Sequence, residues 1–234
     1  MSHRNASRAV GGERYLNRPQ TEPTLLLNEL YASVQGEGPE QGYPTVLVRL
    51  TGCNLRCSYC DSAFAFFKGQ RVALGEVVRR VASHEIRRVL VTGGEPMAQA
   101  ATPVLCRALL DAGRSVSIET NGAYDLGCLP GEVLKVVDVK APASGEEGSF
   151  QLPVLDELDG KDVIKFVLSS REDYLWAVDF LARHHLPGPA GVVFSPVSGL
   201  LDPAVLAEWI VGDRLEVRLQ VQLHKVLWGN KRGV

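Results

Sequence analysis

The stretch from Leu50 to Asp61 reads LTGCNLRCSYCD and places Cys53, Cys57 and Cys60 in the spacing C-x3-C-x2-C. No apolar face of a helix or strand requires three thiols so close together, so we interpret them as ligands of one metal centre. Thiolates suit zinc or iron–sulfur clusters. A structural zinc ion takes four ligands, and a [4Fe–4S] cluster is usually held by four cysteines. Because the loop supplies three, one iron of a cubane would keep an open position for a substrate or cofactor.

This spacing, with an aromatic residue before the third cysteine, resembles the signature of the radical S-adenosylmethionine (SAM) enzymes. The resemblance implies a [4Fe–4S] cluster on Cys53, Cys57 and Cys60, with SAM chelating the open iron through its amino and carboxylate groups. An electron from the cluster would then cleave SAM to a 5′-deoxyadenosyl radical. The alternative is a zinc site with a remote fourth ligand, such as Cys106 or Cys128.

Composition and charge favour a small-molecule enzyme over a nucleic-acid-binding or membrane protein. The 234 residues suffice for one domain with a substantial core, and 45% of them are hydrophobic. The formal net charge is −2, so the chain has no excess of basic residues. A surface that binds a long duplex or a tRNA usually requires such an excess. No apolar run reaches the roughly 18 residues of a membrane-spanning helix. We therefore expect a small-molecule substrate, no nucleic acid and no membrane.

Cysteine usage and the N-terminal residues indicate the compartment and the domain boundary. An odd number of cysteines, five, with three of them clustered, does not fit a secreted disulfide framework. We therefore expect the reducing cytoplasm. Residues 1–23 contain no apolar run, so no signal peptide is expected. We predict a poorly ordered leader over residues 1–24 and a single radical SAM domain over residues 25–234.

Strand and helix patterns alternate along the chain. Apolar, β-branched runs predict strands at 45–50, 87–92, 115–120, 133–140, 162–170 and 191–196, and alternation predicts a last one at 215–224. Periodicity predicts helices at 74–85, 97–113, 171–185 and 202–211. This order implies an α/β fold with parallel strands. Polar, glycine-rich and cysteine segments repeatedly follow a strand, which puts them on one rim of a barrel. Six units are too few to close an eight-stranded barrel, so we predict a partial, open (β/α)6 TIM-like barrel of the radical SAM type, abbreviated in helices.

A glycine pair follows the second predicted strand of this series, in the segment TGGEP at residues 92–96. Two glycines allow the backbone to approach a ligand closely. The radical SAM resemblance implies that Gly93, Gly94 and Glu95 lie along the methionine part of SAM and contact its ammonium group. A tight strand-to-helix turn is the structural alternative.

Residues 28–65, NELYASVQGEGPEQGYPTVLVRLTGCNLRCSYCDSAFA, carry a narrower resemblance. They resemble the opening of the 7-carboxy-7-deazaguanine synthases, which has a SVQGEG-type loop, G-x-P, a strand with an arginine, the cysteine loop and C-D-T. Residues 221–234, VQLHKVLWGNKRGV, are also similar to some members. The resemblance implies a radical ring contraction of 6-carboxy-5,6,7,8-tetrahydropterin to 7-carboxy-7-deazaguanine, with release of ammonia, on the route to queuosine-type 7-deazapurines.

The family resemblance also implies a set of substrate contacts. They fall on Val34, Gln35, Gly36, Glu37, Arg49, Thr92 and His224. A buried arginine at a strand end needs an anionic partner, and the substrate carboxylate would supply one for Arg49. The structural alternatives are a surface turn at GEG, an internal ion pair for Arg49, a strand end at Thr92 and a packing role for His224.

SAM and magnesium contacts are implied in the same way. Those beside SAM fall on Glu119, Asn121, Asp138, Val139, Lys140, Ser195, Pro196, Val197 and Ser198. Many members have glutamine where this chain has Ser195, and Asn-Gly at 121–122 is also a common turn. Ser62 stands where the family has threonine and keeps the hydroxyl group that implies a Mg²⁺ ligand.

Two rival functions share part of this pattern. A radical SAM activase, which makes a glycyl radical on a partner protein, would carry the cysteine loop and GGEP but needs no pterin pocket. A non-catalytic zinc-binding module would need only the cysteines. The resemblance to the synthases further implies a homodimer and an electron donor such as flavodoxin or ferredoxin.

Overall fold

The computed structural model describes residues 22–184, 186 and 191–234. Its centre is a row of six parallel strands whose apolar residues are buried on both faces, as expected of a sheet covered on both sides. These strands are β2 (Pro44–Leu50), β4 (Arg88–Gly93), β5 (Ser115–Thr120), β6 (Leu134–Val139), β7 (Val163–Leu168) and β8 (Gly191–Pro196). The predicted partial (β/α)6 barrel is thus confirmed.

Three further strands extend this row at its two ends. β1 (Thr24–Val34) pairs antiparallel with both β2 and β3 (Gln70–Ala73), and β9 (Arg218–Leu219) pairs parallel with β8. The order is β3-β1-β2-β4-β5-β6-β7-β8-β9. No strand is predicted at β1, because its sequence, TLLLNELYASV, mixes polar and apolar residues without regular alternation.

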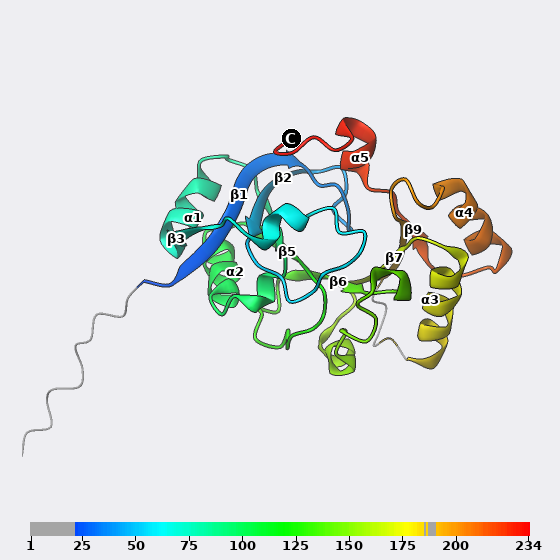
Figure 1. Cartoon of the computed structure of the whole chain (residues 1–234). Coiled ribbons are helices and arrows are strands. Elements are labelled where there is room, and N and C mark those ends of the chain that lie inside the picture. Colours follow the sequence, from blue (N-terminus) through cyan, green and yellow to red (C-terminus); the bar gives the residue numbers. More distant parts are fainter. Residues whose placement is uncertain (1–21, 185, 187–190) are drawn as a thin grey trace, which may run out of the picture.

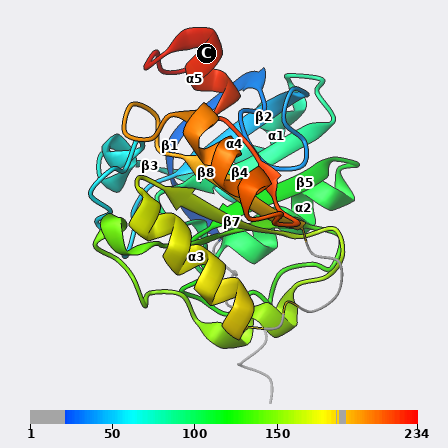
Figure 2. The ribbon, with the colours of Figure 1, turned by 90° about the vertical axis from the view of Figure 1, so that its right-hand side faces the viewer.

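Helices lie on the outside of the curved sheet, and the cyan segment that follows β2 lies over its centre in Figure 1. Figure 2 shows α3 and α4 covering the side of β7 and β8. The α-helices are α1 (Leu74–Ala82), α2 (Thr102–Asp111), α3 (Arg171–Arg183), α4 (Pro203–Gly212) and α5 (Leu223–Trp228). Short 3-10 turns are η1 (Ala63–Phe66), η2 (Pro96–Ala98), η3 (Pro142–Ser144) and η4 (Leu152–Glu157).

Helices are missing from two crossovers, as the prediction of an abbreviated barrel requires. Residues 121–133 and 140–162, all within the described part of the chain, contain no α-helix. The chain there connects neighbouring parallel strands through loops and the turns η3 and η4. Fewer helices leave this side of the sheet covered by loops.

Two predicted elements are wrong in extent. The strand predicted at 215–224 reduces to β9, because the Gln220 side chain leaves the sheet and exchanges hydrogen bonds of 2.7 and 2.9 Å with the backbone of Gly38. The helix predicted at 97–113 begins only at Thr102. Glu95 instead caps η2 by accepting a hydrogen bond from Met97 N–H, at 2.9 Å.

The predicted leader falls mostly on residues 1–21, which lie outside the described residues. Its last residue, Thr24, already belongs to β1, and the Glu22 carboxylate accepts a 2.8 Å hydrogen bond from Gly75 N–H at the start of α1. Among the described helices, none combines the length and the hydrophobicity needed to cross a membrane.

Candidate active site

A cavity of about 700 Å³ opens at the carboxyl ends of the parallel strands. That edge is where open α/β sheets bind ligands. Most of the predicted site residues line the cavity: Val34, Gln35, Gly36, Glu37, Arg49, Cys53, Cys57, Cys60, Ser62, Thr92, Gly93, Gly94, Glu119, Asn121, Asp138, Lys140, Val197, Ser198 and His224. Segments distant in the sequence thus meet around one space.

The cysteine loop forms one wall of this cavity. Backbone hydrogen bonds hold the start of the loop, since Gly52 N–H donates to Ala65 O at 2.9 Å and Gly52 O accepts from Glu95 N–H at 2.7 Å. The thiols of Cys53, Cys57 and Cys60 are free and half-buried, and burial raises the pKa of each. A bound metal removes that proton, because a coordinating thiol is deprotonated.

The donor set fits a cluster better than a single ion. Cys106 is buried in the core and Cys128 is exposed, and neither lines the cavity. Among the described residues, no group of three or more His, Cys, Asp or Glu side chains is arranged to hold one metal ion. Each ligand of a [4Fe–4S] cluster binds its own iron, so the three loop thiols need not converge on one point.

The glycine pair packs directly against the cysteine loop. A Cβ atom on Gly93 would lie 2.2 Å from Leu50 O, and one on Gly94 would lie 2.0 Å from Gly52 O. Real Cβ atoms do not approach backbone oxygens so closely. Both positions therefore require glycine, and Gly93 also has a φ of 144°.

Four predicted SAM-side residues do not line the cavity: Glu95, Val139, Ser195 and Pro196. The fully buried Glu95 carboxylate accepts hydrogen bonds from Thr120 Oγ1 and Asn121 N–H, both at 2.7 Å, besides the one from Met97 N–H. It therefore ties the GGEP turn to the end of β5. Val139 packs in the core, and Ser195 Oγ is buried without a hydrogen-bond partner among the described residues.

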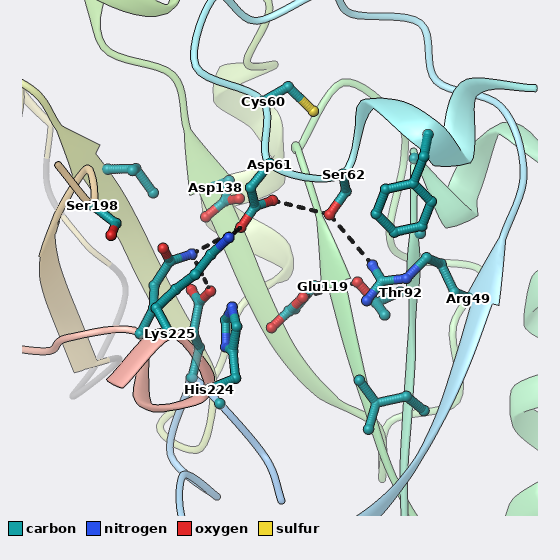
Figure 3. Close-up of a pocket in the computed structure, with 18 of the residues that line it drawn as sticks. Arg49, Cys60, Asp61, Ser62, Thr92, Glu119, Asp138, Ser198, His224 and Lys225 are labelled. Carbon is teal, nitrogen blue, oxygen red and sulfur yellow. Dashed lines mark hydrogen bonds and ion pairs between the residues drawn. The ribbon is translucent and has the colours of Figure 1, made fainter. Parts of the chain in front are cut away.

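Arg49 has its anionic partner within the protein. Its Nε lies 2.9 Å from Glu29 Oε1, and its Nη1 lies 3.5 Å from Ser62 Oγ. Ser62 Oγ in turn donates to Asp61 Oδ1 at 2.9 Å. Figure 3 shows Arg49, Ser62 and Asp61 in line, with Asp61 between Ser62 and the ammonium group of Lys225. The Arg49 side chain also lines the cavity.

A chain of buried charges crosses the floor of the cavity. Lys165 Nζ lies 2.7 Å from Glu37 Oε2 and 3.2 Å from Asp138 Oδ1, and Lys140 Nζ lies 3.0 Å from Asp138 Oδ2. Burial opposes ionisation of Glu37, but the charge of Lys165 and the hydrogen bonds from Lys165 and Gln222 together lower the pKa of this carboxyl. Burial raises the pKa of Glu119, whose Oε2 accepts a 2.8 Å hydrogen bond from Thr92 Oγ1.

His224 closes the cavity from the C-terminal segment. Its imidazole packs so tightly on Gly36 that a Cβ there would meet Nδ1 at 2.1 Å. The neighbouring Leu223 N–H donates to Gly36 O at 3.0 Å. Burial lowers the pKa of His224 despite the nearby Glu37 and Asp61 carboxylates, which favours the neutral imidazole.

Several cavity residues are not predicted from the sequence. The segment from Gly229 to Val234 contributes to the wall, and Arg232 stacks 3.5 Å above the ring of Phe64 while its Nη2 lies 3.4 Å from Glu29 Oε2. Gln222 donates to Glu37 Oε1 at 2.8 Å. One sequence feature could have indicated a further cavity residue: the apolar strand VIKFVL contains a lysine, Lys165.

Comparisons with known proteins agree with this geometry. Residues 47–138 match the family model for the radical SAM superfamily. The 7-carboxy-7-deazaguanine synthase of Koribacter versatilis is 42% identical over 87% of this chain and 97% of the relative. That of Chlorobaculum tepidum is 40% identical over 92% of this chain and 99% of the relative.

Solved structures share the fold. The crystal structure of QueE from Escherichia coli has a TM-score of 0.72 at 21% identity and covers 85% of this chain and 94% of that one. Streptococcus suis SuiB bound to the precursor peptide SuiA has a TM-score of 0.56 at 15% identity, covering 77% of this chain and 49% of that one. Taken with the identity to the curated relatives and the cavity formed around the cysteine loop, these likenesses lead to one conclusion. The chain belongs to the 7-carboxy-7-deazaguanine synthase family of radical SAM enzymes.

Proposed function

We propose that the protein converts 6-carboxy-5,6,7,8-tetrahydropterin to 7-carboxy-7-deazaguanine with release of ammonia, in queuosine-type 7-deazapurine biosynthesis. The observation that carries this proposal is a single cavity with the cysteine loop on one wall and Gln35, Glu37 and Arg49 on the others. Such a cavity can hold a cofactor and a polar, carboxylated ring side by side. Family membership supports the same reaction.

Cluster and SAM would occupy the wall formed by the cysteine loop and the glycine turn. Cys53, Cys57 and Cys60 would hold the cluster, and Gly93 and Gly94, packed against the cysteine loop, line the cavity beside them. When bound, these groups supply a 5′-deoxyadenosyl radical that removes a hydrogen atom from the substrate. The remaining SAM contacts would come from Glu119, Asn121, Asp138, Lys140, Val197 and Ser198, which all line the cavity.

The pterin ring would lie against the turn at residues 34–37. Gln35 is 2% exposed, and its Oε1 has no hydrogen-bond partner among the described residues. Buried polar atoms are almost always satisfied, so a ring N–H of the substrate is a fitting donor. Glu37 is held ionised and can accept from ring N–H groups as well. His224, neutral and packed on Gly36, completes this wall.

The substrate carboxylate would bind between Arg49 and a Mg²⁺ ion. Ser62 Oγ and Asp61 Oδ1 lie 2.9 Å apart on the wall, and oxygen donors of this kind fit magnesium. The Arg49 guanidinium, 3.5 Å from Ser62 Oγ, repels a cation there, and the Asp61 carboxylate together with a bound anion would offset that repulsion. A substrate carboxylate supplies that anion and orients the ring over the cavity floor.

A homodimer, a reductant such as flavodoxin or ferredoxin, and a cytoplasmic location complete the proposal. Clustered free thiols support a reducing compartment. Radical SAM chemistry requires a low-potential electron, which supports a dedicated reductant protein.

Anaerobic turnover tests the proposal. The reconstituted protein is incubated with SAM, dithionite, Mg²⁺ and the carboxypterin, and products are identified by mass together with released ammonia. We expect 7-carboxy-7-deazaguanine, ammonia and loss of the pterin. SAM cleavage without change of the pterin would instead favour an activase that acts on a protein. Iron-free, colourless protein with bound zinc after anaerobic purification would favour a zinc module.

A further inference from the structure

Lys165 is a buried ammonium at the junction of two cavity walls. Its side chain is 5% exposed on β7, and it reaches Glu37, which lies 128 residues earlier in the chain. The same ammonium also contacts Asp138 on the adjacent strand β6, at 3.2 Å. One lysine therefore joins a residue on the proposed substrate wall to a residue on the proposed SAM wall.

We propose that Lys165 is a positioning residue for the substrate, acting through Glu37, with Asp138 anchoring its ammonium group. This inference rests on the proposed function. It adds a residue that does not itself contact the reacting atoms, and it predicts which of the two bound molecules depends on that residue.

Lys165 supplies the positive charge that balances the buried Glu37 carboxylate. Within the described part of the chain, Lys165 is the one cation in ion-pair distance of Glu37, whose other partner, Gln222, is neutral. Asp138 has a second cation, Lys140, at 3.0 Å. Loss of Lys165 would therefore leave Glu37 buried without a cation but leave Asp138 paired. A buried, uncompensated carboxylate takes up a proton or turns towards water.

The Lys165–Glu37 ion pair also fixes the position of the turn that carries Glu37. The turn that carries Glu37 lies at the end of β1 and is held from the C-terminal side by Gln220, which bonds to Gly38. Lys165 belongs to β7, which is hydrogen-bonded to β6 and β8 along its length. The Lys165–Glu37 ion pair therefore fastens the turn at residues 35–38 to the sheet, and the carboxylate keeps one orientation towards the cavity.

The chain contains a matched control for this ion pair. Lys135 on β6 lies 2.9 Å from Asp162, and its side chain is 6% exposed. Neither Lys135 nor Asp162 lines the cavity. Lys135→Met removes a buried lysine from a buried carboxylate, as Lys165→Met does, although Asp162 keeps Lys161 at 3.7 Å, and it should destabilise the fold without reaching the ligands.

The test is a set of binding constants on cluster-loaded protein without reductant, so that no turnover occurs. Dissociation constants for the carboxypterin and for SAM, the iron content and the Tm are measured for both methionine variants. We expect Lys165→Met to weaken pterin binding by at least about tenfold, or about 1.4 kcal/mol, because Glu37 loses its cation, and to change SAM binding less than about threefold. Lys135→Met should lower the Tm and change neither constant.

Two further variants separate positioning from mere folding. Lys165→Arg keeps a cation and should restore most of the pterin affinity, even if Lys165→Met proves too unstable to purify. Glu37→Gln should weaken pterin binding in the parent but add little in the Lys165→Met background, because coupled residues are not additive. Parent-like pterin binding by Lys165→Met, equal loss of SAM affinity, or equal loss in Lys135→Met would overturn the inference. A parent protein that binds no pterin would instead overturn the proposed function.

Discussion

The backbone of Gly94 lies against the carbonyl group of Gly52, and a Cβ atom on residue 94 would come within 2.0 Å of that oxygen. The same carbonyl accepts a hydrogen bond from Glu95 N–H at 2.7 Å. Cys53 follows Gly52 directly, so the first cysteine is positioned by a turn that lies about forty residues further along the chain. The glycine turn and the cysteine loop therefore form one structural unit.

Gly94→Ala should damage this unit. The added methyl group must push Gly52 away, and overpacking of this kind costs about 1–3 kcal/mol. We expect a lower Tm and a lower iron content after anaerobic reconstitution. Gly131→Ala is the control, because a Cβ there meets no atom within 4 Å. Full iron loading of Gly94→Ala would contradict the close packing.

Cluster loading should depend on the three loop cysteines alone. Replacing Cys53, Cys57 or Cys60 with alanine should abolish the cluster and SAM cleavage, because each thiolate binds one iron. Cys106→Ala and Cys128→Ala should retain both, since neither thiol lines the cavity. Iron and sulfide analysis gives the measurement. Complete loss of iron in Cys106→Ala would show that the three-ligand assignment is wrong.

Arg49→Lys should weaken substrate binding by roughly tenfold while leaving SAM binding unchanged. A guanidinium can donate to Glu29 and still form parallel hydrogen bonds with a carboxylate ligand. The ammonium group of a lysine cannot form that paired arrangement. Binding isotherms for the carboxypterin and for SAM make the comparison. An equal loss for both molecules, together with a lowered Tm, would mean that the Arg49–Glu29 pair only supports the fold.

Ser62→Ala should slow turnover and leave the cluster intact. A hydroxyl is a weak neutral ligand, so Mg²⁺ and the substrate carboxylate should each strengthen binding of the other. Raising Mg²⁺ should therefore restore part of the rate in Ser62→Ala, and Ser62→Thr should behave like the parent. Turnover is measured against Mg²⁺ concentration. Identical curves for the parent and Ser62→Ala would remove Ser62 from the metal site.

The imidazole of His224 should titrate below the ordinary histidine value of 6.5, because burial lowers its pKa. A histidine with a depressed pKa in the folded state favours folding above its unfolded pKa and loses that contribution as the pH falls. We expect the free energy of unfolding to drop as the pH falls below about 6.5, and to drop less in His224→Asn. An NMR titration of the imidazole reads the pKa directly, and a midpoint above 6.5 would contradict the burial argument.

Local sequence patterns predicted the six parallel strands correctly, because each is a short β-branched run buried on both faces. The motifs were equally visible, since the cysteine spacing and the glycine pair each lie within a few residues. Adjacent positions must obey the same local geometry whatever the rest of the chain does. The cysteine loop, the six parallel strands and the family therefore follow from the sequence itself.

The tertiary structure alone decided which charges meet. Arg49 pairs with Glu29 across the antiparallel ladder between β1 and β2, and Lys165 reaches Glu37 across 128 residues. Glu95 has the sequence context of a ligand contact. Its carboxylate instead accepts hydrogen bonds from Thr120, Asn121 and Met97. Leu223 was predicted to lie in a strand, but its backbone N–H instead donates a hydrogen bond to Gly36 O.

The physical reason is the same in each case. A buried charge is stable only beside an opposite charge or a set of hydrogen-bond donors, and those partners come from whichever strand the sheet register brings alongside. Sequence spacing determined that three thiols would lie in one loop and two glycines in one turn of this protein. Only the tertiary structure decided that Lys165 would pair with Glu37, and Glu29 with Arg49, around the same cavity.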